Sequence, residues 1–109
     1  MNFNEYQKKS RRTAIYPHAG NNFIYPTLGL SGETGEVAEK IKKILRDKEG
    51  KLDSENRDIL QKELGDVLWY LAQIATETGL SLEDIAQGNL DKLRNRQKDN
   101  KLQGEGDDR

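Results

Sequence analysis

Two stretches decide the fold: residues 29–47, GLSGETGEVAEKIKKILRD, and residues 60–77, LQKELGDVLWYLAQIATE. Both repeat apolar residues at the three- and four-residue spacing that forms one face of an α-helix. The apolar positions are Leu30, Val37, Ile41, Ile44 and Leu45 in the first stretch and Leu60, Leu64, Val67, Leu71, Ile74 and Ala75 in the second. Because no sustained apolar/polar alternation and no Asn-Gly or Asp-Gly turn occurs, we expect an all-α helical bundle.

The whole chain predicts about four helices, of which the two central ones are long. We expect them at residues 5–14, 28–47, 54–78 and 82–97. Asn4 and Ser81 are expected to be N-caps, since a side-chain oxygen there can accept a free backbone N–H. Residues 16–26 contain both prolines and are expected to form a loop.

The composition suggests one small domain that needs a partner copy. The chain has 109 residues, 33% of them hydrophobic and 34% charged. A chain this small with so few apolar residues buries little surface. We therefore expect a homo-oligomer, either a dimer or a tetramer, in which the copies complete one another's core. We assign residues 1–97 to the domain and expect the glycine- and charge-rich segment 98–109 to be a disordered tail.

Charge and cysteine content exclude several classes of protein. A net charge of -1 gives no reason to expect a nucleic-acid or membrane-surface binder. No apolar run has the length of a membrane span, and the polar N-terminus does not resemble a secretory signal. With no cysteine, disulfides and thiolate metal sites are excluded. We therefore expect a cytoplasmic protein.

Two pairs of carboxylates mark a candidate metal site. Glu33 and Glu36 lie three residues apart in one long helix, and Glu63 and Asp66 lie three apart in the other. Residues at i and i+3 share a helix face, so the pairs can converge if the helices pack antiparallel. Four close carboxylates repel one another, and Mg²⁺ bound to them would also coordinate a polyphosphate.

Two other interpretations of these acids stay open at this point. Acidic residues are common on solvated helix surfaces, and this reading is as well supported by the sequence alone as the metal site. A di-iron carboxylate bundle would require Glu-x-x-His on its helices. The only histidine, His18, lies in the expected loop, which argues against di-iron.

The same residues carry a resemblance to a known family. The segments GLSGETGEVAEKIKK (residues 29–43) and ELGDVLWYL (residues 63–71) resemble the MazG-type nucleotide pyrophosphohydrolases. The resemblance extends from about residue 28 to 96. It implies an all-α oligomer that uses Mg²⁺, with Mn²⁺ as the alternative, to cleave a nucleoside triphosphate between its α- and β-phosphates.

The resemblance also implies residue roles. By position, Glu33, Glu36, Glu63 and Asp66 match the family's metal ligands, and one of the first pair would instead activate the attacking water. Asn89, Lys92 and Arg96 match residues that contact the phosphates. The family pattern often has a further Glu where this chain has Gly32, which leaves the number of metal ions open.

Other residues carry weaker predictions. Tyr70 lies four residues after Asp66 and is expected near the ribose or base. Trp69 points elsewhere and is expected in the core or an interface. The glycines Gly29, Gly32 and Gly35 are expected to permit close helix packing. The basic run Lys8, Lys9, Arg11 and Arg12 is expected to be solvated.

The function expected from sequence is Mg²⁺-dependent hydrolysis of (d)NTP to (d)NMP and pyrophosphate, in nucleotide-pool housekeeping. Two alternatives remain. A phosphoribosyl-ATP pyrophosphohydrolase would share the helical core and the chemistry. A non-enzymatic helical interaction module would account for the high charge and incomplete core, and would not be stabilised by Mg²⁺.

Overall fold

The computed structural model describes residues 1–99 and is helical throughout its regular parts. Its elements are α1 (Phe3–Ser10), the short 3-10 helix η1 (Arg11–Thr13), α2 (Ile24–Asp47), α3 (Ser54–Glu77) and α4 (Leu82–Lys98). No strand occurs among these residues, so the predicted all-α class with two long central helices is confirmed.

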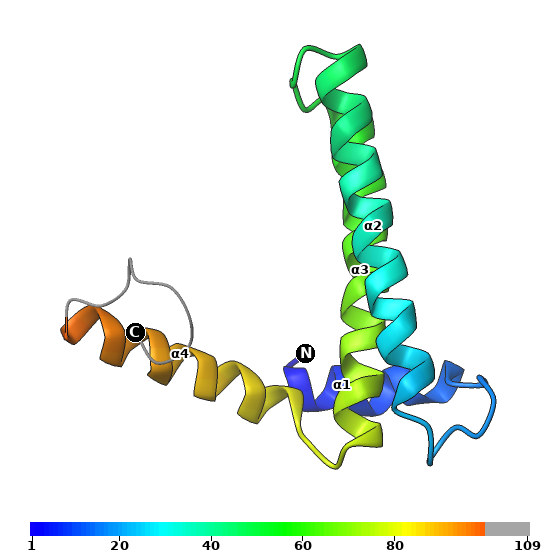
Figure 1. The fold of residues 1–109 in the computed structure, drawn as a ribbon, viewed down its shortest axis with the longest axis vertical. Helices are drawn as coiled ribbons and strands as arrows, with labels where there is room; N and C mark the ends of the chain where they lie inside the picture. The colour runs from blue at the N-terminus through cyan, green and yellow to red at the C-terminus, as the bar shows by residue number, and fades with distance from the viewer. Residues whose placement is uncertain (100–109) are drawn as a thin grey trace.

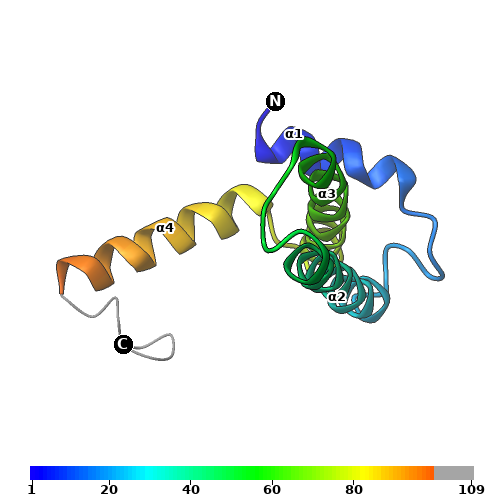
Figure 2. The same cartoon turned by 90° about the horizontal axis from the view of Figure 1, so that it is seen from above.

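The molecule is built on an antiparallel hairpin of α2 and α3. These helices lie side by side over their whole length and are joined at one end by residues 48–53 (Figure 1). At the other end α1 crosses α3, whereas α4 extends away from the hairpin in both views (Figure 2). The main contacts of α4 with another helix are with α1.

Side-chain caps start three of the helices. Asp53 caps α3, and Ser81 caps α4 by accepting the Asp84 N–H at 3.0 Å, as predicted. The prediction for the first helix was wrong: Asn2, not Asn4, is the N-cap and accepts the Glu5 N–H at 2.9 Å. Asn2 is favoured because Glu5 lies at the capping-box position and its carboxylate accepts the Asn2 side-chain amide.

The start of α2 was also mispredicted. The helix begins at Ile24, so Pro26 lies in its first turn and not in a loop. Proline is tolerated there because the first N–H groups of a helix have no intrahelical acceptor. The Asn22 side chain accepts the N–H groups of Ile24 and Tyr25 at 3.1 and 3.0 Å, which fixes this start.

The core is small, as the composition predicts. Ala72, Ala75 and Leu82 form its buried centre, with Tyr6 and Leu71 packed against them. Large apolar side chains remain outside: Leu45 is 69% exposed and Leu64 is 54% exposed. The oligomer that would cover them stays a prediction.

Two expectations concern the ends and the membrane. Among residues 1–99, no helix combines the length and apolar character needed to cross a bilayer. Of the expected tail, Lys98 is the last residue of α4 and Asp99 caps it. The rest of that segment, residues 100–109, lies outside the described residues.

Candidate functional site

Three of the four predicted carboxylates meet across the hairpin. Glu33 on α2 and Glu63 and Asp66 on α3 each present an oxygen, and these oxygens all lie within 4.8 Å of one another. Glu33 and Glu63 are half-buried and Asp66 is exposed. The antiparallel packing of α2 on α3 produces this convergence from two separate i, i+3 pairs.

Glu36 lies beside this acidic group and not within it. It is exposed, one turn further along α2 than Glu33. Partial burial raises the pKa of Glu33, and the charges of Asp66, Glu63 and Glu36 raise it further, in that order. The charges of the other three acids therefore act on Glu33, as expected where carboxylates lie close together.

The donor set fits a hard divalent cation. Three carboxylates offer only oxygen, and their partial exposure leaves room for waters or phosphate oxygens, which is the coordination that Mg²⁺ prefers. Within residues 1–99 no histidine joins the group. The alternative of a di-iron bundle, which would require histidine ligands, is not supported.

Tyr70 borders the acidic group one turn along α3. Burial raises the pKa of its hydroxyl, and the neighbouring Tyr25, Glu33 and Asp66 contribute in the same direction. Its ring lies directly over Gly29, where an added Cβ would be only 2.2 Å from Cε1 of Tyr70. Close packing at a glycine is thus confirmed for Gly29.

The same expectation was wrong for the other two glycines of α2. A Cβ on Gly32 or Gly35 would meet nothing within 4 Å among the described residues. An added side chain at either position would therefore not obstruct the packing of α2 on α3.

Aromatic side chains continue the surface next to Tyr70. Tyr16 stacks on Tyr25 with ring centroids 5.1 Å apart, and Trp69 presents an edge to both Tyr16 and Tyr70. The Trp69 indole donates to the Thr13 hydroxyl at 2.9 Å. Trp69 therefore joins α3 to η1, which agrees with the packing role expected for it.

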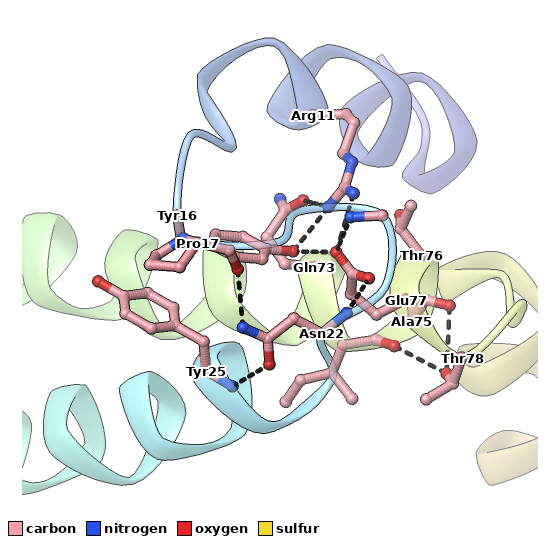
Figure 3. Close-up of polar contacts among 12 residues, drawn as sticks. Arg11, Tyr16, Pro17, Asn22, Tyr25, Gln73, Ala75, Thr76, Glu77 and Thr78 are labelled. Atoms are coloured by element: carbon pink, nitrogen blue, oxygen red, sulfur yellow. Dashed lines mark hydrogen bonds and ion pairs between the residues drawn. The ribbon is translucent and has the colours of Figure 1, made fainter.

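A buried carboxylate that the sequence analysis missed holds these aromatics in place (Figure 3). Glu77 accepts hydrogen bonds from the Arg11 guanidinium, the Tyr16 hydroxyl and the backbone N–H groups of Gly20 and Asn22. Its side chain is fully shielded from solvent. Burial opposes its ionisation, but the hydrogen bonds outweigh burial and lower the pKa of Glu77 to about 2.

This network also corrects the expectation for the basic run. Lys8, Lys9 and Arg12 are exposed as expected, but Arg11 is half-buried. Besides Glu77, at 2.8 Å, Arg11 contacts the Tyr16 hydroxyl and the side-chain oxygen of Gln73. One feature of the sequence could have predicted that polar side chains of α3 need partners here. Gln73 and Glu77 continue the helical stripe of Asp66 and Tyr70 toward the apolar end of α3, where uncompensated polar residues would be costly.

The structure does not bring the predicted phosphate contacts to the acidic group of the same chain. Asn89, Lys92 and Arg96 lie on α4, which leaves the hairpin in both views (Figures 1 and 2). Asn89 and Lys92 are exposed, whereas Arg96 is buried.

Comparison with known proteins identifies the family. Residues 26–100 match the MazG nucleotide pyrophosphohydrolase domain. The chain belongs to the MazG family. This MazG match covers α2 from residue 26 and all of α3 and α4, and so includes the four acids, Tyr70 and the three predicted phosphate contacts of α4.

One curated relative is similar over its full length. The chain is 49% identical, over 114 aligned residues, to the Gene 37 protein of Mycobacterium phage L5, with 100% of both chains covered. No solved structure matches this MazG chain.

Proposed function

We propose that this protein is a Mg²⁺-dependent nucleoside triphosphate pyrophosphohydrolase, which converts (d)NTP to (d)NMP and pyrophosphate in nucleotide-pool housekeeping. The observation that carries the proposal is the convergence of Glu33, Glu63 and Asp66 in a chain of the MazG family. Carboxylate oxygens gathered in one place are the protein ligands through which Mg²⁺ on a polyphosphate substrate is usually held.

Each acid has a distinct part in the proposed reaction. Glu33, Glu63 and Asp66 would hold Mg²⁺, or Mn²⁺ as the alternative. When bound, the cation would neutralise phosphate charge and lower the pKa of a water. Glu36 is exposed and one turn away, so it is placed either to complete the ligand set or to accept the proton from the water that attacks the α-phosphorus.

The nucleoside would lie on the aromatic side of the acids. Tyr70 is expected to contact the ribose or base, with the Tyr16–Tyr25 stack behind it. Aromatic faces stack on any base, so these residues alone favour no particular one.

The α4 residues would act from a second copy. Since α4 leaves the hairpin of its own chain, Asn89, Lys92 and Arg96 are proposed to contact the phosphates bound to a partner subunit's hairpin. Arginine binds phosphate through its donor fork and lysine adds a point charge. This proposal ties activity to the homo-oligomer that the exposed apolar side chains favour.

Pyrophosphate release from a panel of (d)NTPs and phosphoribosyl-ATP, with Mg²⁺, tests the function. Glu36→Gln and Asp66→Asn should each abolish release, whereas Glu39→Gln, which alters an exposed glutamate paired with Lys42, should not. Release that survives both site substitutions would reject the site. Preferential cleavage of phosphoribosyl-ATP would establish the alternative enzyme, and the absence of any Mg²⁺-dependent change in melting temperature would favour the interaction module.

A further inference from the structure

The acidic group is the middle of a longer stripe that runs along the hairpin. On a helix, positions separated alternately by three and four residues share one face. On α2 this face contains Glu33, Glu36, Lys40, Lys43 and Asp47, and on α3 it contains Asn56, Ile59, Glu63, Asp66 and Tyr70. Because α2 and α3 are antiparallel neighbours, the two faces meet along one side of the hairpin. They meet in the acidic group, and again in a cavity that residues of both helices line.

A cavity with three lysines in its lining lies on this side of the hairpin, at the end near the connecting loop. Its volume is about 200 Å³, and Lys40, Lys43, Lys48, Asp47 and Asn56 are among the residues that line it. The Asp47 carboxylate is already held by the Arg46 guanidinium at 2.8 and 3.0 Å. Lys48 lies 3.9 Å from Asp53.

Lys40 and Lys43 differ from these paired groups. Neither forms an ion pair or a hydrogen bond with any other residue in the range 1–99. Lys40 is half-buried, with Ile44 and Ile59 beside it in the cavity lining. Two ammonium groups beside a concave and partly apolar surface favour a multiply charged anion.

The two lysines are offset from the acids along the axis of the hairpin. Lys40 and Lys43 each lie two helical turns beyond Glu33 and Glu36, about 10 Å along the axis. In the opposite direction, Tyr70 lies one turn beyond Asp66. This side of the hairpin thus presents an aromatic end, an acidic centre and a cationic end, which is the order of base, metal-bound phosphate and terminal phosphates in a nucleoside triphosphate.

We propose that the cavity at Lys40 and Lys43 binds the terminal phosphates that leave as pyrophosphate, and so fixes the direction in which the substrate lies. This inference rests on the proposed function. In that reaction the water oxygen bonds to the α-phosphorus, its proton goes to a base, and the bond to the bridging oxygen breaks with its electron pair. The negative charge gained by the departing pyrophosphate develops at the end of this face where Lys40 and Lys43 lie.

Calorimetric titration of the full-length protein with inorganic pyrophosphate and Mg²⁺ tests the inference directly. Lys40→Gln with Lys43→Gln should weaken pyrophosphate binding by about tenfold or more, because charge-assisted hydrogen bonds are lost. Binding of a nucleoside monophosphate should stay within about twofold, since it uses the other end. Lys42→Gln, an equal charge change off the stripe, should alter neither.

Replacing both lysines with arginine checks that charge, and not local packing, is responsible. The arginine variant should keep pyrophosphate binding. Unchanged pyrophosphate binding in the glutamine variant, or weakened monophosphate binding in its place, would overturn the inference while leaving the pyrophosphohydrolase activity intact. If instead the wild type binds pyrophosphate through these lysines but releases none from any nucleotide, the cavity assignment stands and the proposed function fails.

Discussion

Gly29 and Tyr70 are in such close contact that no larger residue fits at Gly29 without moving the ring. An added Cβ would lie 2.2 to 2.6 Å from three ring carbons of Tyr70. The ring is also held by the edge-on contact with Trp69, at 5.1 Å between centroids. The position of the aromatic next to the acidic group is therefore set by a missing side chain on the facing helix.

Gly29→Ala should displace Tyr70 and lower the free energy of unfolding by about 1–3 kcal/mol, the usual cost of overpacking. Gly32→Ala is the matched control: it faces open space and should gain about 1 kcal/mol from helix propensity. Urea unfolding measures both. In a Tyr70→Ala background the Gly29 substitution should lose its cost, and additive effects would contradict the contact.

The Glu77 network predicts a specific acid sensitivity. Because folding lowers the pKa of Glu77 from 4.5 to about 2, this carboxylate stabilises the protein above pH 4.5, and its contribution is lost as the pH falls toward 2. Glu77→Gln should cost about 3 kcal/mol at neutral pH, since it leaves the half-buried Arg11 guanidinium without its carboxylate partner.

Thermal unfolding between pH 2 and 7 measures this effect. Glu77→Gln should flatten the acid limb of the stability curve, whereas Asp58→Asn, at an exposed position of α3, should leave it unchanged. Equal acid limbs in Glu77→Gln and wild type would show that the carboxylate does not carry this dependence.

The helices and the acidic group were predictable because both follow from local spacing. The apolar stripes gave α2 and α3, and the i, i+3 pairs gave Glu33, Glu63 and Asp66. By contrast, Glu77 and Arg11 are 66 positions apart, and nothing local in the sequence pairs them. The direction in which α4 leaves α3 depends on the turn at Gly79, where φ is 75°. No pattern in the sequence predicts that direction.

Neutralising one acid should have opposite effects without and with metal. In metal-free protein, Asp66→Asn removes a charge that opposes ionisation of Glu33, so it should raise the melting temperature slightly. With Mg²⁺, the wild type should gain stability from binding and the variant should not. Differential scanning calorimetry measures the melting temperature of each protein with EDTA and with Mg²⁺. If Mg²⁺ raised the melting temperature of both proteins equally, Asp66 would not be a ligand of the proposed metal site.

The exposed apolar residues of α2 predict an assembly in solution. Ile41 and Leu45 share a helix face and are 47% and 69% exposed. Light scattering coupled to size exclusion should find a dimer or tetramer. Ile41→Ser with Leu45→Ser should shift it toward monomer, while Arg57→Ser, at an exposed polar position, should not. A wild-type protein that is monomeric at all concentrations would refute this prediction.

Sharing of α4 between subunits can be tested by mixing inactive proteins. Asp66→Asn removes the metal site and Lys92→Ala removes a proposed phosphate contact, so each homo-oligomer should lack activity. If α4 serves a partner subunit's hairpin, refolding the two together should restore about a quarter of wild-type activity from mixed pairs that contain one intact site. Mixtures as inactive as their components would place α4 elsewhere.

The hairpin also has a consequence for the order of folding. Residues 33–66 belong to one continuous helix–loop–helix segment. Contacts between residues that are close in sequence form quickly. The ion pair and hydrogen bonds that fasten residues 11–22 to Glu77 close loops of 55 to 66 residues and therefore form late. During folding, the acidic group would accordingly assemble before Tyr16 is fixed by Glu77, so that the proposed metal site would form before the proposed nucleoside site is complete.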